Sequence, residues 1–220
     1  MSPRRPDPAV SLRLVEAAAR VLADEGEGAV SARRIAGEAG VSTMAVYTHF
    51  GSMDDLLAAV RREGFQRFGI ELDRPALTAD PVADLMAQGW GYRHFALTDR
   101  HLYRVLFQPR ASTSAPPTEG DIEASMATFG SLLRRIERCV AADRFTIDDV
   151  VTTGEVVWSV VHGHSMIELA GHHETMGRDP VASYEACMLH LVIGFGDEPD
   201  AARRSLVRSR ARAQRIGQLA

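Results

Sequence analysis

Apolar residues recur along the chain at intervals of three and four positions, which is the spacing of one face of an α-helix. Near the amino terminus Leu12, Val15, Ala19 and Leu22 follow this spacing, and Gly26 offers a left-handed stop after them. No stretch alternates apolar and polar residues as a half-buried strand would, and no internal repeat is visible. The pattern predicts an all-α fold.

Serines stand where three further helices are expected to begin, and glycines stand where two of them end. A serine hydroxyl accepts hydrogen bonds from the free N–H groups of a helix's first turn, and glycine readily adopts the conformation that ends a helix. The expected helices are 32–39 after Ser31, 43–49 after Ser42 and, after Ser52 with Asp55 three residues on, a long helix that includes Leu56.

The rest of the chain also follows the helical pattern, with two interruptions. Loops are predicted at 108–117, which is rich in proline, and at 171–179. From Gly196 the chain is acidic and then arginine-rich, which favours a solvated, partly disordered or loosely helical tail; an extra phosphate-binding strip is the alternative. The helices are expected at 81–97, 99–107, 119–142, 147–170 and 180–195.

Composition narrows the class of protein. The 220 residues are 45% hydrophobic and 25% charged, as in an ordinary globular protein. No apolar run approaches the roughly 18–20 residues of a membrane span, and no signal peptide follows the basic start, so we expect a cytoplasmic protein. Cys139 and Cys187 are far apart and show no metal-binding spacing, so they are interpreted as buried small side chains.

The charge of the chain gives no overall basic field. All 25 basic residues are arginine, and the formal net charge is −4. Any contact with nucleic acid must therefore come from a local surface.

Residues 31–50 provide such a surface, because they form two short helices joined by a tight turn at Gly40. Apolar residues of both helices are placed to pack them at a steep angle, which leaves the second helix projecting. A projecting helix fits the major groove, which is about 12 Å wide. The packing residues are Ile35, Ala36, Val41 and Val46; the candidates for base edges are Thr43, Met44, Ala45 and Thr48; the candidates for phosphates are Ser42, Tyr47 and His49.

This region resembles the DNA-binding region of TetR-family repressors over residues 11–60. The stretch that carries the resemblance is ARRIAGEAGVSTMAVYTHFGSMDDLLAAV, in which a dozen positions agree with the family's pattern. The resemblance implies that Arg33 contacts a base or a phosphate, whereas Arg34 is ambiguous and is interpreted as solvated. The ring of Tyr47 could instead pack in the core while its hydroxyl reaches a phosphate. The agreeing positions include Ile35, Ala36, Ala39, Gly40, Val41, Ser42, Val46, Tyr47, His49, Phe50 and Leu56.

One position departs from the family's pattern. Members commonly have a phosphate-binding lysine where this chain has Met53, and Asp54 and Asp55 follow it. Residues 1–62 hold eight arginines against eight acidic residues, so this region is neutral. We therefore expect phosphate binding to depend on Arg33 and on Arg4 and Arg5 in a flexible arm, 1–10.

The resemblance implies three parts: a helix-turn-helix DNA-binding domain, 1–62; a helical effector-binding and dimerisation domain, 63–196; and the charged tail, 197–220. Residues 156–170 look like the Trp…His-Gly segment of one TetR subgroup. Gly163, in the middle of that helix, suggests close helix approach or room beside a cavity. Aromatics at helical spacing are often core, but a small-molecule pocket is predicted from Trp90, Arg93, Phe95, Tyr103, Phe107, Trp158, His162 and Met166.

Family members dimerise through their last two helices, which here are expected at 147–170 and 180–195. The alternative is that the apolar residues of these helices fill only the monomer core. The residues concerned are Val156, Val160, Ile167, Met188, Leu191, Val192 and Phe195.

A stripe of histidines raises the question of a metal site. His164, Glu168 and His172 lie four residues apart, but a straight helix separates the outer pair by about 12 Å and His172 falls at or past the helix end. We therefore predict no metal site and interpret the stripe as a polar strip on the surface or at a dimer interface.

The sequence as a whole favours a DNA-binding transcriptional regulator, most simply a repressor that binds a (pseudo)palindromic operator as a homodimer and leaves it when a small molecule binds. Activation is not distinguished from repression. An enzyme is disfavoured because no nucleophile elbow, phosphate loop or metalloprotease motif occurs, and no catalytic residue or cofactor is predicted. A helical interaction module with a vestigial helix-turn-helix is the remaining alternative, slightly favoured by the neutral charge and by Met53.

Overall fold

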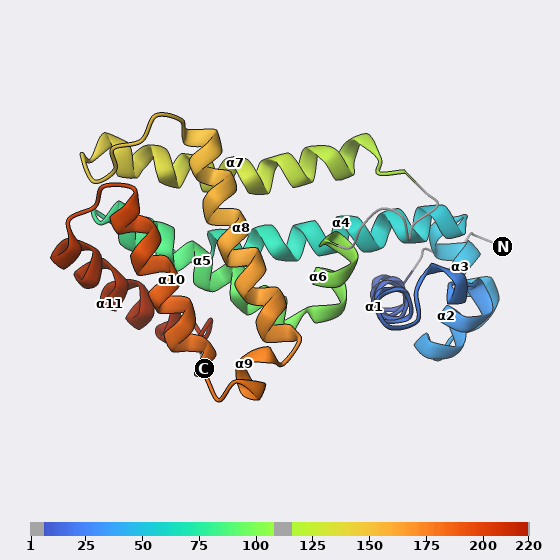
Figure 1. The fold of residues 1–220 in the computed structure, drawn as a ribbon. Helices are drawn as coiled ribbons and strands as arrows, with labels where there is room; N and C mark the ends of the chain where they lie inside the picture. Colours follow the sequence, from blue (N-terminus) through green and yellow to red (C-terminus); the bar gives the residue numbers. More distant parts are fainter. Residues whose placement is uncertain (1–6, 108–115, 220) are drawn as a thin grey trace. The chain divides into compact units, whose positions relative to one another are not determined.

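A computed structural model describes residues 7–107 and 116–219, and within these ranges it contains helices and no strand (Figure 1). The predicted all-α fold is thus confirmed. Arg4, Arg5 and residues 108–115 of the predicted loop lie outside the described residues. None of the helices formed by the described residues is both long and apolar enough to cross a membrane.

Contacts group the chain into two compact units, each of which has its own core. Unit 1 comprises 1–67 and 99–125, and unit 2 comprises 68–98 and 126–220. Two long helices, α4 (Met53–Asp73) and α7 (Glu119–Ala141), contribute residues to each unit.

Unit 1 is built around α1 (Pro8–Glu25), which contacts α2 (Ala32–Ala39), α3 (Thr43–Phe50) and α6 (Arg100–Phe107). A short 3₁₀ turn, Glu27–Ala29, links α1 to α2. The core includes Leu14 of α1 together with Leu56 and Val60 of α4, all fully buried.

The start of α1 differs from the sequence-based expectation. The helix begins at Pro8, inside the expected flexible arm 1–10, because Asp7 caps it by accepting a hydrogen bond from the N–H of Ala9 at 2.9 Å. The helix turns Leu14 and Val15 inward, whereas Leu12, the first residue of the predicted apolar spacing, is 42% exposed.

Unit 2 is built around α5 (Pro81–Thr98), which is buried on every side over most of its length. An apolar helix of this kind needs neighbours all round. Aromatic and long aliphatic side chains, such as Trp90 and Phe95, fill the space between α5 and those neighbours. The helices that contact α5 include α8 (Val150–Leu169), α10 (Pro180–Gly194) and α11 (Pro199–Arg215), and α9 (His172–Thr175) packs against α8.

The arginine-rich tail forms α11, an ordered helix packed against α5 and α10 (Figure 1). The expectation of a solvated tail is therefore wrong. Small side chains at spacings of three and four form its buried face: Ala202, Ser205, Ser209 and Ala213. Their size lets α11 approach α5 closely.

Two acidic residues beside the start of α5 anchor α11. Asp80 accepts a hydrogen bond from Arg208 at 2.7 Å, and the fully buried Asp84 accepts one from Arg212 at 2.6 Å. Burial alone would raise the pKa of Asp84, but hydrogen bonds from Thr78, Arg138 and Arg212 outweigh this effect and lower the pKa. The carboxylate is therefore held in its charged form.

The two cysteines are both free thiols, as the sequence indicates. Cys139 is fully buried, and burial raises the pKa of its thiol to about 12. Cys187 is half-buried.

Candidate nucleic-acid interface and effector site

The turn between α2 and α3 has the geometry of a helix-turn-helix. Ser31 caps α2 by accepting a hydrogen bond from the N–H of Arg34 at 3.2 Å, as predicted. Gly40 ends α2 in the left-handed conformation with φ 66°, where a side chain would be strained. Ile35 and Val46 are fully buried and hold the two helices together.

The outward face of α3 is open to solvent. Met44 is 70% exposed and Tyr47 is 47% exposed, and Thr43 and Thr48 lie on the same exposed surface, beside the half-buried Ala45. The hydroxyl of Thr48 donates to the carbonyl of Met44 at 2.9 Å. Hydroxyl, methyl and thioether groups thus share one face of a projecting helix, which is the mixture that base edges and thymine methyls require.

Two of the predicted phosphate contacts have a different environment from the one expected. Ser42 occupies the capping position of α3, but its side chain makes no capping hydrogen bond, so the expected cap is wrong and the hydroxyl is exposed. His49 is half-buried, and its Nδ1 lies 2.8 Å from Oγ of Ser11 on α1. Only Nε2 of His49 is then left for a phosphate.

The adjacent residues Arg33 and Arg34 have different surroundings. Arg34 forms ion pairs with Glu25 at 2.6 Å and with Glu38 at 3.0 Å, and these hydrogen bonds raise the pKa of Arg34. Arg33 is exposed and has no ion pair or hydrogen bond within the described residues. Arg33 is therefore the cation of α2 that is available to an external anion.

A further available cation, Arg13, was missed in the sequence. It is exposed on α1, two residues after the Ser11 that contacts His49, and it has no ion pair within the described part of the chain. The apolar spacing of α1 alone did not mark this position, because the contact between Ser11 and His49 joins residues 38 positions apart.

The amino terminus of α4 presents backbone N–H groups but little positive charge. The hydroxyl of Ser52 accepts from the N–H of Asp55 at 3.1 Å and donates to its carboxylate at 2.6 Å, so the predicted cap is confirmed. Asp54 and Asp55 are both exposed there.

The predicted effector residues fall into separate groups. Tyr103 and Phe107 belong to unit 1, where their ring centres lie 4.9 Å apart. The other six belong to unit 2, on α5 (Trp90, Arg93 and Phe95) and on α8 (Trp158, His162 and Met166).

Within unit 2 the α8 residues mostly face outward. Trp158 is 41% exposed and Met166 is 46% exposed. His162 is half-buried, its Nδ1 lies 2.9 Å from the hydroxyl of Tyr92, and burial lowers its pKa.

Trp90 instead lies in a buried polar cluster that the sequence did not predict. Its ring lies 4.4 Å from that of Tyr184, which in turn lies 5.2 Å from the ring of His164. The ring of His164 lies 4.8 Å from that of His173. We call Trp90, His164, His173 and Tyr184 the buried polar cluster; it gathers side chains from α5, α8, α9 and α10.

Several polar atoms of this cluster have no hydrogen-bond partner within the described residues. They include Nε1 of Trp90, the hydroxyl of Tyr184 and both ring nitrogens of His173. Nδ1 of His164 lies 3.9 Å from a carboxylate oxygen of Glu168, which is too long for a hydrogen bond. Gly89 makes room for the Tyr184 hydroxyl, because a Cβ there would lie only 2.1 Å from it. Buried polar groups normally have partners, so this cluster calls for a partner of its own.

The charged groups beside the cluster neutralise each other. Arg93 donates two hydrogen bonds to Glu168, one of them 2.7 Å long, and its guanidinium lies 5.9 Å from the centre of the Trp90 ring. Burial lowers the pKa of His164, the nearby Glu168 partly opposes this, and burial raises the pKa of Tyr184. Burial thus favours the uncharged forms of His164 and Tyr184, while Arg93 and Glu168 pair with each other.

The histidine stripe, predicted as a polar strip on the surface or at a dimer interface, is only partly exposed in this chain. His164 and His173 are both buried, while His172 is exposed on α9. The stripe is broken because α8 ends at Leu169 and Gly171 adopts a left-handed conformation. Within the described residues, no group of three or more His, Cys, Asp or Glu side chains is arranged to hold a metal ion.

Comparison with known families defines the class of the protein. Residues 14–60 match the model of bacterial regulatory proteins of the tetR family, and residues 85–191 match the model of the tetracyclin repressor-like carboxy-terminal domain. A helix-turn-helix reader followed by this helical domain is the arrangement of a transcriptional regulator. The chain belongs to the TetR family.

Solved structures share this fold. A protein with unknown function from Rhodococcus sp. RHA1 superposes with a TM-score of 0.73 and 23% identity, over 88% of this chain and 100% of that one. The TetR-family regulator PfmR from Thermus thermophilus superposes with a TM-score of 0.63 and 22% identity, over 70% of this chain and 85% of that one. RolR in complex with resorcinol superposes with a TM-score of 0.58 and 20% identity, over 90% of this chain and 93% of that one. No curated protein matches the sequence.

Proposed function

We propose that this TetR-family regulator is a repressor that binds a (pseudo)palindromic DNA operator as a homodimer and is released from it by a small molecule. The observation that carries the proposal is the exposed face of α3, where Thr43, Met44, Tyr47 and Thr48 project from a helix-turn-helix. Arg33 supplies an unpaired cation next to this face, on α2. A helix so presented reads base edges in the major groove while nearby cations position it on the phosphates.

The proposal is tested by measuring DNA binding by fluorescence anisotropy, with a duplex from the region upstream of the coding sequence and a scrambled duplex as competitor. The protein is expected to prefer the upstream duplex and to bind it more weakly as salt rises. Replacing Tyr47 and Thr48 together by Ala is expected to lower the affinity at least tenfold. The matched control is Met126→Ala, which truncates a 70% exposed side chain outside α3.

Folding and association of the double variant are followed by circular dichroism and light scattering. Loss of DNA binding with both properties retained supports α3 as the reader. Equal binding of the two duplexes at low salt, or full binding by the double variant, would contradict it and favour an interaction module.

The homodimer is proposed to form through α8 and α10, which contact each other in unit 2. Val156 is 40% exposed and Ile167 is 42% exposed, and half-buried Val160 and Gly163 lie between them at helical spacing. Of the residues expected at this interface, Met188 and Val192 are instead buried in the core of the unit, and Leu191 and Phe195 are half-buried. An apolar stripe left uncovered on α8 is what a second copy would bury.

The effector is proposed to bind at the buried polar cluster. The phenol of Tyr184 and the indole of Trp90 are uncharged groups that lack hydrogen-bond partners within the described residues, and Arg93 already pairs with Glu168. Such a site suits a hydroxylated ligand better than an acidic one, because hydroxyls both donate and accept hydrogen bonds. The complex of RolR with resorcinol, an aromatic diol, supports this choice of ligand class.

A further inference from the structure

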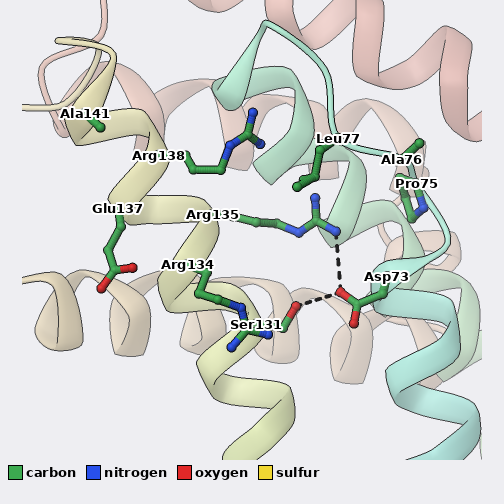
Figure 2. Close-up of a pocket in the computed structure, with 10 residues that line it drawn as sticks. All are labelled: Asp73, Pro75, Ala76, Leu77, Ser131, Arg134, Arg135, Glu137, Arg138 and Ala141. Atoms are coloured by element: carbon green, nitrogen blue, oxygen red, sulfur yellow. Dashed lines mark hydrogen bonds and ion pairs between the residues drawn. The ribbon is translucent and has the colours of Figure 1, made fainter.

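A second candidate site in unit 2 is a cavity away from the buried polar cluster, between α7 and the connection that follows α4. Its volume is about 590 Å³, which is within the range of small-molecule pockets. Figure 2 shows side chains of α7 on one side and the segment from Asp73 to Leu77 on the other. The lining residues of α7 are Ser131, Arg134, Arg135, Glu137, Arg138 and Ala141.

Arg135 is the unusual residue of this pocket. It is only 5% exposed, yet its Nε and Nη1 have no hydrogen-bond partner within the described residues. Its remaining nitrogen, Nη2, donates to the carbonyl of Leu72 at 3.3 Å and lies 3.5 Å from Oδ1 of Asp73. Burial lowers the pKa of Arg135, and the charge of Asp73 only partly opposes this.

Asp73 is the ion-pair partner of Arg135, but the pair is long and its carboxylate is shared. Its side chain is 61% exposed to solvent, and its Oδ1 already accepts a hydrogen bond from Ser131 at 2.7 Å (Figure 2). A separation of 3.5 Å between nitrogen and oxygen is longer than a hydrogen bond to a charged group. The guanidinium is thus buried with one long ion pair, through Nη2, among the described residues, while Nε and Nη1 have no hydrogen-bond partner there.

Several other buried or half-buried arginines among the described residues have a carboxylate at closer range. Arg138, the next cation along α7, lies 2.7 Å from Asp84 and also donates to the carbonyl of Thr78. Carboxylates lie within 2.7 Å of Arg61 (Asp121), Arg93 (Glu168), Arg144 (Asp197) and Arg212 (Asp84). A buried charge is costly unless it is paired, so the guanidinium of Arg135 marks a place for an external anion.

The rest of the lining limits what that anion can be. Arg134 is exposed, has no ion pair within the described residues, and offers a second cation. The carboxylates of Asp73 and Glu137 line the same pocket and would repel a polyanion. Pro75, Ala76, Leu77 and Ala141 supply apolar surface, and Leu77 is 59% exposed.

We propose that this pocket binds a small organic monocarboxylate, with its carboxylate on Arg135 and Arg134 and its apolar body against Leu77 and Pro75. The guanidinium groups of Arg135 and Arg134 supply charge-assisted hydrogen bonds to the carboxylate oxygens. This site goes beyond the proposed function, because it is separate from the buried polar cluster and does not depend on DNA binding.

Binding to the full chain is tested by calorimetric titration with benzoate, its neutral analogue benzamide, and inorganic phosphate, without DNA. Benzoate is expected to saturate one site per chain and to bind at least tenfold more tightly than either benzamide or phosphate. Arg135→Met is expected to lower benzoate affinity at least tenfold, and Arg134→Met severalfold. Arg204→Met, which removes an exposed cation of α11, is the matched control and should leave benzoate binding unchanged.

A second variant keeps the test decisive if Arg135→Met does not fold. Asp73→Asn removes the competing carboxylate while keeping its shape, and it is expected to tighten benzoate binding severalfold. Equal binding of benzoate and benzamide would overturn the proposal, as would tighter binding of phosphate. An unchanged benzoate affinity in the Asp73→Asn variant would also overturn it. These titrations contain no DNA, so their results can be interpreted even if the chain does not bind DNA. The carboxylate-site proposal and the proposed function can therefore be refuted independently.

Discussion

At the scale of single residues, Arg33 and Arg34 differ in what surrounds them. Both are exposed on α2, but only Arg34 has acidic neighbours, one on α1 and one on its own helix. An arginine already held by two carboxylates loses those bonds when it turns to a phosphate, whereas Arg33 loses none. The two side chains therefore differ in their value to DNA binding although they are adjacent in the sequence.

Arg33→Ala is expected to weaken operator binding about tenfold, or about 1.4 kcal/mol, and to reduce the salt dependence by about one phosphate contact. Arg34→Ala, the matched control, is expected to change affinity much less. Both are measured by anisotropy over a series of salt concentrations. A larger loss in Arg34→Ala than in Arg33→Ala would reverse this assignment.

A second prediction at this scale concerns His164, whose pKa in the folded protein is lowered by burial. The unfolded chain takes up this proton at about pH 6.5, whereas the folded chain resists it. The stability that neutral His164 supports is therefore fully present above about pH 6.5 and is lost as the pH falls below it.

The free energy of unfolding in urea is thus expected to be lower at pH 5.5 than at pH 7.5, and His164→Gln should reduce this difference. His172→Gln, at an exposed position on α9, is the control and should preserve it. An unchanged difference in His164→Gln would show that other groups cause the pH dependence.

At the scale of helices, hydrophobic spacing and caps predicted α2, α3, α5 and α6 within a residue or two of their ends. Those signals are local, so a single sequence carries them. The helix α11 was missed because its buried face consists of alanines and serines, which give no hydrophobic signal. Its partners Asp80 and Asp84 lie more than 120 residues away in the sequence.

The attachment of α11 gives a prediction about stability. Arg212→Ala leaves the fully buried Asp84 with one arginine fewer, and losing one partner of a buried ion pair costs about 3 kcal/mol. Unfolding in urea should report a loss of that order. Arg203→Ala, whose partner Asp200 is 72% exposed, should lose less than about 0.5 kcal/mol. Equal losses would mean that the packing of small residues, not the ion pairs, holds α11.

At the scale of the whole molecule, sites differ in how far the sequence reveals them. The exposed face of α3 comes from one short helix, so its periodicity was sufficient to predict it. The buried polar cluster and the Arg135 pocket each join segments dozens of residues apart, and only the tertiary fold brings them together. The amino-acid composition did not reveal these two sites either, because most of the arginines form ion pairs with acidic residues of the same chain.

The association of two copies is the remaining property at this scale. A substitution at Gly163 can test association without disturbing the folding of the monomer. A Cβ at Gly163 would meet no atom within 4 Å in the described residues, although the position lies mid-helix among exposed apolar residues of α8. Replacing glycine inside a helix by arginine favours the helix by up to about 1 kcal/mol, so the monomer should fold at least as well. The same charge placed in an apolar interface between two copies would have no partner and would oppose association.

Gly163→Arg is therefore expected to give a folded monomer by light scattering at concentrations where the unmodified protein is a dimer. Its operator affinity should fall at least a hundredfold, because the two half-sites no longer add their contacts, and its salt dependence should fall by about half. Val207→Arg places the same charge at a 68% exposed position of α11 and should stay dimeric. A Gly163→Arg protein that remains dimeric and binds DNA normally would place the interface elsewhere than on the stripe of α8.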